Sequence, residues 1–89
     1  MLLITTRILP ATLADIPFSQ LATVTAVRWD LLGERAGRRL RELGVDEGVA
    51  VEALHGGPLM TRDPVAVRVG RMTVAIRRAH ALMIEVEPA

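Results

Sequence analysis

The side chains best suited to chemistry in this chain are two histidines, His55 and His80, and a group of arginines between residues 35 and 41. Neither histidine is spaced with a serine and an aspartate in a catalytic pattern, and general acid–base catalysis needs two such groups held in one pocket. The absence of cysteine excludes a thiol nucleophile, a thiolate zinc site and a disulfide framework. The sequence therefore predicts no enzymatic activity and no catalytic residue.

The two histidines are also the main candidates for binding a metal. A closed zinc site needs four ligands, and the available donors are the two histidines and ten carboxylates. His55 starts a polar loop and His80 lies in a turn before the last expected strand. We interpret both as surface histidines and expect no cofactor. As metal ligands they are weak candidates, for a site shared with another molecule.

The arginine group lies on an expected helix that also carries acidic residues. Its members are Arg35, Arg38, Arg39 and Arg41, with Glu34 and Glu42. One interpretation is a docking surface for an acidic protein or for phosphates. The other is a solvated face with i,i+4 pairs between Glu34 and Arg38 and between Arg38 and Glu42. Arg77 and Arg78 form a second, smaller basic spot that has the same two interpretations.

A glycine-rich loop runs from Gly56-Gly57-Pro58 to Asp63-Pro64. It has no Gly-Lys-Ser/Thr ending, so it is not a phosphate-binding P-loop. It is long for a connection between two strands, and long loops are often functional. We expect it at the mouth of a small barrel, where such domains bind partners.

Composition narrows the class of protein. The chain has 89 residues, 51% of them hydrophobic, and a formal net charge of +1. A domain of this size buries only about 60–65% of its unfolded surface, which leaves little material for a deep pocket. Phe18 and Trp29 are the only aromatic residues. So few rings and so balanced a charge argue against a nucleic-acid-binding surface, which needs stacking platforms or an excess of positive charge.

The apolar stretches near the N-terminus are shorter than the ~18 residues of a membrane span. No basic segment precedes them, which argues against a signal peptide. We therefore expect a cytoplasmic, soluble protein without direct membrane insertion. Residues 1–11 show no clear period and are expected to form an N-terminal arm.

Periodicity along the rest of the chain predicts a mainly β domain over residues 12–87. Alternating or β-branched segments predict strands over 20–27, 49–53, 65–69, 72–76 and 84–86. Ala36, Leu40 and Leu43 share one face of a helix over about 34–43, which Gly44 ends. Another short helical turn is expected over about 78–82.

Short strands in so small a chain cannot bury two faces as an open sheet, and closing them removes exposed edges. The predicted fold is therefore a small SH3-like, partly open β-barrel of about five strands with one inserted helix. The sequence is equally compatible with a monomer and with weak pairing of two copies through an edge strand.

Several spaced motifs of the chain resemble the FeoA family (ferrous iron transport protein A). They are Arg39-Leu40-Arg41-Glu42-Leu43-Gly44-Val45, Gly57-Pro58-Leu59 and the closing stretch 68–87 with Ala75-Ile76-Arg77-Arg78. The match runs from about Leu13 to Glu87, nearly the whole chain. It implies an SH3-like barrel and a non-enzymatic cytosolic accessory protein of ferrous iron uptake.

The partner that the resemblance implies is FeoB, a membrane transporter with a cytosolic GTP-binding domain. The residues that the resemblance places near the contact surface are Arg38, Arg39, Leu40, Leu43, Gly57, Pro58 and Leu59. Leu40 is the best single candidate among them. Helical periodicity alone places the same residue in the core, so the two interpretations of Leu40 compete.

Two other classes of protein remain as alternatives. The first is a metal-binding or metal-sensing module like the SH3-like C-terminal module of iron-dependent repressors. That module normally follows a helix-turn-helix domain, for which 89 residues leave no room. The second is a nucleic-acid-binding small barrel, which the composition disfavours.

Overall fold

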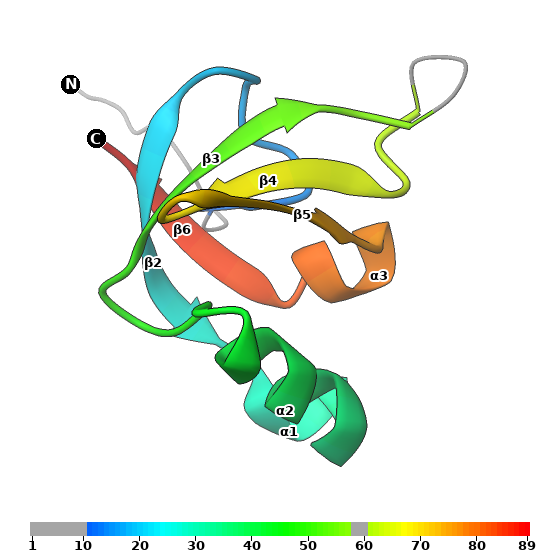
Figure 1. Ribbon diagram of the computed structural model, residues 1–89. Coiled ribbons are helices and arrows are strands. Elements are labelled where there is room, and N and C mark those ends of the chain that lie inside the picture. The colour runs from blue at the N-terminus through cyan, green and yellow to red at the C-terminus, as the bar shows by residue number, and fades with distance from the viewer. Residues whose placement is uncertain (1–10, 58–60) are drawn as a thin grey trace, which may run out of the picture.

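One antiparallel sheet of six strands organises the structure, a computed structural model that describes residues 11–57 and 61–89 (Figure 1). The order of the strands across the sheet is β1-β6-β2-β3-β4-β5. The strands are β1 (Ala11–Thr12), β2 (Leu21–Val27), β3 (Ala50–His55), β4 (Val65–Val69), β5 (Met72–Ile76) and β6 (Ile84–Pro88). The helices are α1 (Trp29–Leu32), α2 (Glu34–Glu42) and α3 (Arg78–Ala81).

The predicted fold class is confirmed. Each predicted strand is present within a residue or two of its expected ends, and α2 and α3 occupy the two predicted helical segments. The structure also contains two elements that the sequence does not predict. They are β1, a two-residue strand that pairs with β6, and α1, a helical turn that precedes α2. In the described residues no helix is long and apolar enough to cross a bilayer.

Strand β2 shows how the sheet departs from simple alternation. Ala22 and Val24 are buried and their neighbours are exposed, as a period of two requires. Pairing with β6 then shifts register between Val24 and Ala26. This bulge adds one residue to the strand, so Val27 rather than Ala26 points into the core. The shift also leads the chain out of the sheet into α1.

The core contains aliphatic side chains only. Its buried members include Leu13, Val24, Val51, Val67 and Ile84, each no more than 1% exposed. Both aromatic residues lie outside it, because Phe18 is 40% exposed and Trp29 packs only against the edge of the core. No polar or charged side chain is buried among the residues that the structure describes. The barrel interior is therefore filled and offers no polar cavity.

The N-terminal arm expected over residues 1–11 lies outside the described residues, except for Ala11, which begins β1. The turn that follows belongs to the folded domain. The Leu13 backbone N–H donates to the Ile84 carbonyl oxygen at 2.9 Å, and the Leu13 side chain is fully buried. The Arg62 guanidinium also donates, from Nη2, to the Ile16 carbonyl oxygen at 2.7 Å.

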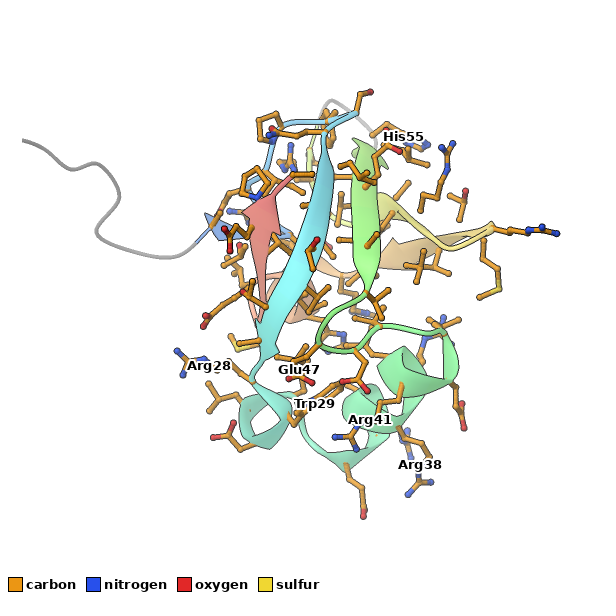
Figure 2. All side chains as sticks on the ribbon, turned by 90° about the vertical axis from the view of Figure 1, so that its left-hand side faces the viewer. Arg28, Trp29, Arg38, Arg41, Glu47 and His55 are labelled. Carbon is orange, nitrogen blue, oxygen red and sulfur yellow. The ribbon has the colours of Figure 1, made fainter. Side chains whose placement is uncertain are left out.

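The helical insertion and the glycine-rich loop lie at opposite ends of the sheet. Figure 1 shows α1 and α2 below the strands and the loop that follows β3 above them on the right. Figure 2 shows the same separation from the side, with His55 at the top and Arg38 and Arg41 at the bottom. Any surface on α2 is therefore separate from any surface on the loop.

Burial predicts a large difference between two leucine substitutions. We expect Leu13→Ala to lower the free energy of unfolding by about 2–5 kcal/mol, because it leaves a cavity in the core. The matched control is Leu31→Ala, where the leucine is 62% exposed and the change should stay within about 0.5 kcal/mol. Urea unfolding of both variants measures the difference. Equal losses would mean that the segment before β2 does not contribute to the core.

Candidate functional site

Helix α2 is the element that carries most of the predicted site residues, and its ends are well defined by sequence. Gly33 separates it from α1 with a backbone φ of 86°. Glu34 stands in its first turn and Arg39 and Arg41 in its last, which suits the helix dipole. The helix-ending prediction for Gly44 is confirmed by its φ of 94°.

The C-terminal end of α2 is a Schellman motif. The Val45 N–H donates to the Leu40 carbonyl oxygen at 2.9 Å, and the Gly44 N–H donates to that of Arg41 at 3.0 Å. Val45 and Leu40 are both buried, which supplies the apolar contact that accompanies this motif. The end of the helix is thereby anchored to the barrel.

A cluster around Trp29 attaches the other side of the insertion to the barrel (Figure 2). The Glu47 carboxylate accepts from the Trp29 indole Nε1–H at 3.2 Å and from the Val27 backbone N–H at 3.1 Å. The Arg41 guanidinium lies 4.1 Å from the centre of the Trp29 ring, a cation–π contact. We call Trp29, Arg41 and Glu47 the tryptophan cluster.

Gly37 is buried in the middle of α2 and faces the Trp29 ring. A Cβ atom at position 37 would stand 3.4 Å from the indole, an ordinary van der Waals contact. The ring therefore leaves room for a methyl group there, and nothing in the structure explains a glycine that costs helix stability.

Asp46, next to the tryptophan cluster, carries the one resolved electrostatic shift of the described residues. Hydrogen bonding with the Glu47 side chain lowers the pKa of Asp46 below its ordinary 3.8. The Glu47 backbone N–H, which donates to Asp46 Oδ1 at 2.8 Å, adds to the effect. Because the pKa is lower in the folded state, this contribution to stability is present at neutral pH and is lost as the pH falls through the folded-state value.

Two grooves flank α2, one on each side. The first, about 650 Å³, is the tryptophan groove, and its lining is Trp29, Asp30, Gly33, Glu34, Gly37, Arg38, Arg41 and Glu42. The second, about 310 Å³, is the histidine groove, and its lining is Ala36, Arg39, Leu40, Leu43, Ala75, Ile76, Arg77 and His80. Helix α2 alone separates the two, and its residues contribute to both.

The predicted partner-binding residues of α2 are divided between these grooves. Arg38 lines the tryptophan groove, whereas Arg39, Leu40 and Leu43 line the histidine groove. Leu40 is only 4% exposed and belongs to the core, as its helical period predicted. The small exposed part of the Leu40 side chain forms part of the floor of the histidine groove, so a partner can contact Leu40 only there.

The expected ion pairs of α2 are absent. The three ion pairs within the described part of the chain join Arg28 to Glu85, Arg68 to Glu52 and Arg78 to Asp15. None involves α2, so the pairs expected between Glu34 and Arg38 and between Arg38 and Glu42 do not form. Exposed pairs gain little in water against the entropy of holding two long side chains together. Arg35, Arg38 and Arg39 therefore remain available to a partner, whereas Arg41 stacks on Trp29.

Gly57, another predicted partner-binding residue, lies far from α2. Gly57 belongs to the loop at the opposite end of the sheet, where its N–H donates to the Thr61 carbonyl oxygen at 2.7 Å. A Cβ there would lie 2.7 Å from the Asp63 carbonyl oxygen, so close backbone packing already requires this glycine. Pro58 and Leu59 lie outside the described residues.

The two histidines are separate from each other. His55 ends β3 near the loop, and His80 lines the histidine groove beside α2. His55 Nδ1 is 3.1 Å from the Gly56 carbonyl oxygen. Across residues 11–57 and 61–89, no three side chains of the types His, Cys, Asp and Glu are grouped so as to hold a metal.

Two residues of this region are not predicted as site residues from the sequence. Trp29 stands out there only as one of two aromatic residues, and Glu47 gives no signal. Arg77 belongs to the smaller basic spot, for which a docking surface is one of the two interpretations, but its place beside Arg39 comes only from the structure. No periodicity signals the pairing of Trp29 with Glu47, because α1 and the turn before β3 are not regular neighbours.

Taken together, a curved six-stranded sheet with an aliphatic core and a helical insertion defines a small SH3-like barrel. The FeoA domain family matches residues 11–88. The chain therefore belongs to the FeoA family, whose members are non-enzymatic accessory proteins associated with ferrous iron transport.

Solved structures agree with this assignment. The chain is 32% identical to the FeoA of Stenotrophomonas maltophilia, a prokaryotic SH3 domain protein solved with zinc, over 86% of this chain and 89% of that one, with a TM-score of 0.74. It is 32% identical to the FeoA protein of Chlorobium tepidum over 88% of this chain and 70% of that one, with a TM-score of 0.72.

A third structure supports the fold alone. The iron(II) transport protein A of Clostridium thermocellum is 22% identical over 89% of this chain, with a TM-score of 0.78. The present chain spans 46% of the length of that protein. No curated protein sequence matches the chain.

The tryptophan cluster predicts a specific effect of removing one carboxylate. We expect Glu47→Ala to lower the free energy of unfolding by about 1–3 kcal/mol and to change Trp29 fluorescence, because two N–H donors lose their acceptor. Glu47→Gln keeps an acceptor oxygen and should restore part of the loss. Glu87→Ala, on an exposed position of β6, is the control. Unchanged stability and fluorescence in Glu47→Ala would show that the cluster does not fix the insertion.

Proposed function

We propose that this chain is a cytoplasmic regulatory protein of ferrous iron uptake that binds the cytosolic part of a FeoB-type transporter through its helical insertion. Membership of the FeoA family supports the association with iron transport. The observation that carries the choice of surface is the exposed arginine cluster of α2, which forms no ion pair within the described residues. Charged side chains left without partners are typical of docking surfaces that steer association.

The rigid attachment of α2 supports the same choice. The Schellman motif at one end and the tryptophan cluster at the other hold the helix against the barrel without burying its outer face. A surface that is fixed before binding loses less conformational entropy on association. The filled core and the absence of buried polar side chains in the described residues leave surface recognition as the means by which the protein acts.

The second surface that could contact the transporter is the glycine-rich loop. Its candidate contact residues are Gly57, Pro58 and Leu59, of which the structure describes Gly57. It lies at the far end of the sheet from α2. One compact partner domain that contacts α2 would therefore leave the loop free. We assign the primary contact to α2 because its exposed charges are concentrated on one element.

An amide-shift titration distinguishes these surfaces. We expect isotope-labelled protein, titrated with the purified cytosolic GTP-binding domain of its transporter, to shift amides of residues 34–45 and of the two grooves. Raising the salt concentration should weaken binding, because exposed charges are screened. Shifts confined to residues 55–57 and 61–64 would instead place the contact on the loop.

Two further results of the same experiment bear on the proposal. Ferrous iron added alone serves as the comparison, and shifts centred on His55 or His80 would favour the metal-sensing alternative. A titration with the GTP-binding domain that moves no amide would contradict the proposed binding to that domain.

A further inference from the structure

The two grooves beside α2 differ in charge. The tryptophan groove is lined by three carboxylates, from Asp30, Glu34 and Glu42, and by two arginines, one of which stacks on Trp29. The histidine groove is lined by Arg39, Arg77 and His80 and by no carboxylate. The arginines of the histidine groove therefore have no carboxylate in the same groove to neutralise them, unlike those of the tryptophan groove.

The floor of the histidine groove is apolar and is built from two elements. Leu40 and Leu43 come from the end of α2, and Ala75 and Ile76 come from the end of β5. Leu40 and Ile76 are almost fully buried, at 4% and 2% exposure. Leu43 is half-buried and Ala75 is exposed, so the open part of the floor is a short aliphatic strip.

The two arginines of the groove stand on opposite walls of this strip. Arg39 is in the last turn of α2, whereas Arg77 precedes α3 and His80 lies within it. Both arginines are exposed, and neither belongs to any of the three ion pairs of the described residues. Their guanidinium groups can each pair with a carboxylate in a planar, bidentate fashion.

We propose that the histidine groove is the docking site for an acidic peptide segment with a large aliphatic side chain, belonging to the cytosolic part of the transporter. The aliphatic side chain lies on the open strip formed by Leu43 and Ala75, and flanking carboxylates pair with Arg39 and Arg77. This inference rests on the proposed function and names the groove and the chemistry of the bound segment.

Size and polarity favour a peptide over a nucleic acid. A volume of about 310 Å³ is at the lower end of the ~300–1,000 Å³ range of ligand clefts, which suits one or two side chains. Desolvated aliphatic contact at the centre with charged groups at the rim is the usual arrangement of a protein interface. A phosphate backbone would use the arginines and leave the apolar floor uncovered.

The groove is tested by paired variants of the full chain, titrated with the GTP-binding domain. The double variant Arg39→Glu with Arg77→Glu reverses both walls, and we expect the dissociation constant to rise by at least about tenfold. Arg68→Glu with Arg71→Glu makes the same change of net charge at exposed positions outside α2 and outside this groove, and should alter the dissociation constant by less than about threefold. Amide spectra of the free variants establish that each is folded.

A second pair tests the floor without removing an arginine. Ala75→Glu places a carboxylate in the groove at an exposed position, and Ala79→Glu places one on the exposed face of α3 outside it. We expect only Ala75→Glu to weaken binding. The single indole N–H resonance, from Trp29 in the other groove, should move little when the domain binds.

The possible results separate this inference from the proposed function. If the unmodified chain binds and the Arg39–Arg77 and Ala75 variants bind equally well, the histidine groove is not the docking site. The proposed function then stands without this inference. A large shift of the Trp29 indole with no effect of these variants would place the segment in the tryptophan groove. If the unmodified chain does not bind, the proposed function fails and this inference fails with it. Displacement of the domain by a short single-stranded RNA, abolished by the Arg39–Arg77 variant alone, would show a phosphate site instead.

Discussion

The contact between the Glu47 carboxylate and the Trp29 indole is the interaction on which the arrangement of the surface depends. It joins the start of α1 to the turn before β3, and the same carboxylate also accepts from Val27 at the end of β2. Arg41 stacks on the other part of the indole and so links the ring to α2. Since both grooves are bounded by α2, their shapes are fixed by a cluster that lies in only one of them. A substitution in this cluster should therefore affect the histidine groove at a distance.

The small size of the chain explains why its chemistry is confined to the surface. A core made only of aliphatic residues fills the interior of a barrel of short strands, and both aromatic residues are left at its edge. Where a larger domain could enclose a pocket, this one has room only for shallow grooves between elements. The histidine groove lies where α2 approaches the end of β5 and α3, whereas the tryptophan groove lies between α1 and α2.

The elements packed around α2 decide which of its charged side chains line each groove. On the helix alone, four arginines stand against two glutamates, and this mixture is compatible with an ordinary solvated face. In the structure the acidic residues Glu34 and Glu42 line one groove, whereas Arg39 faces the other together with Arg77 and His80. Folding thus sorts a mixed helix into one compensated and one positively charged side. That separation of charge is the basis for assigning an acidic segment to the histidine groove.

The sequence by itself determined five of the six strands and the helix predicted over about 34–43 with its glycine end, because periodicity and local turn chemistry depend on neighbouring residues. Its motifs also carry the resemblance to the family. For Leu40 the sequence left two interpretations open, and the structure places that side chain in the core. The tertiary structure alone decided the bulge in β2, the pairing of Trp29 with Glu47, and the separation of Gly57 from α2 by the length of the sheet. It also joined Arg77 and His80 to Arg39, residues that are far apart along the chain. Such contacts depend on how β5, α3 and α2 pack together, and no local pattern encodes that packing.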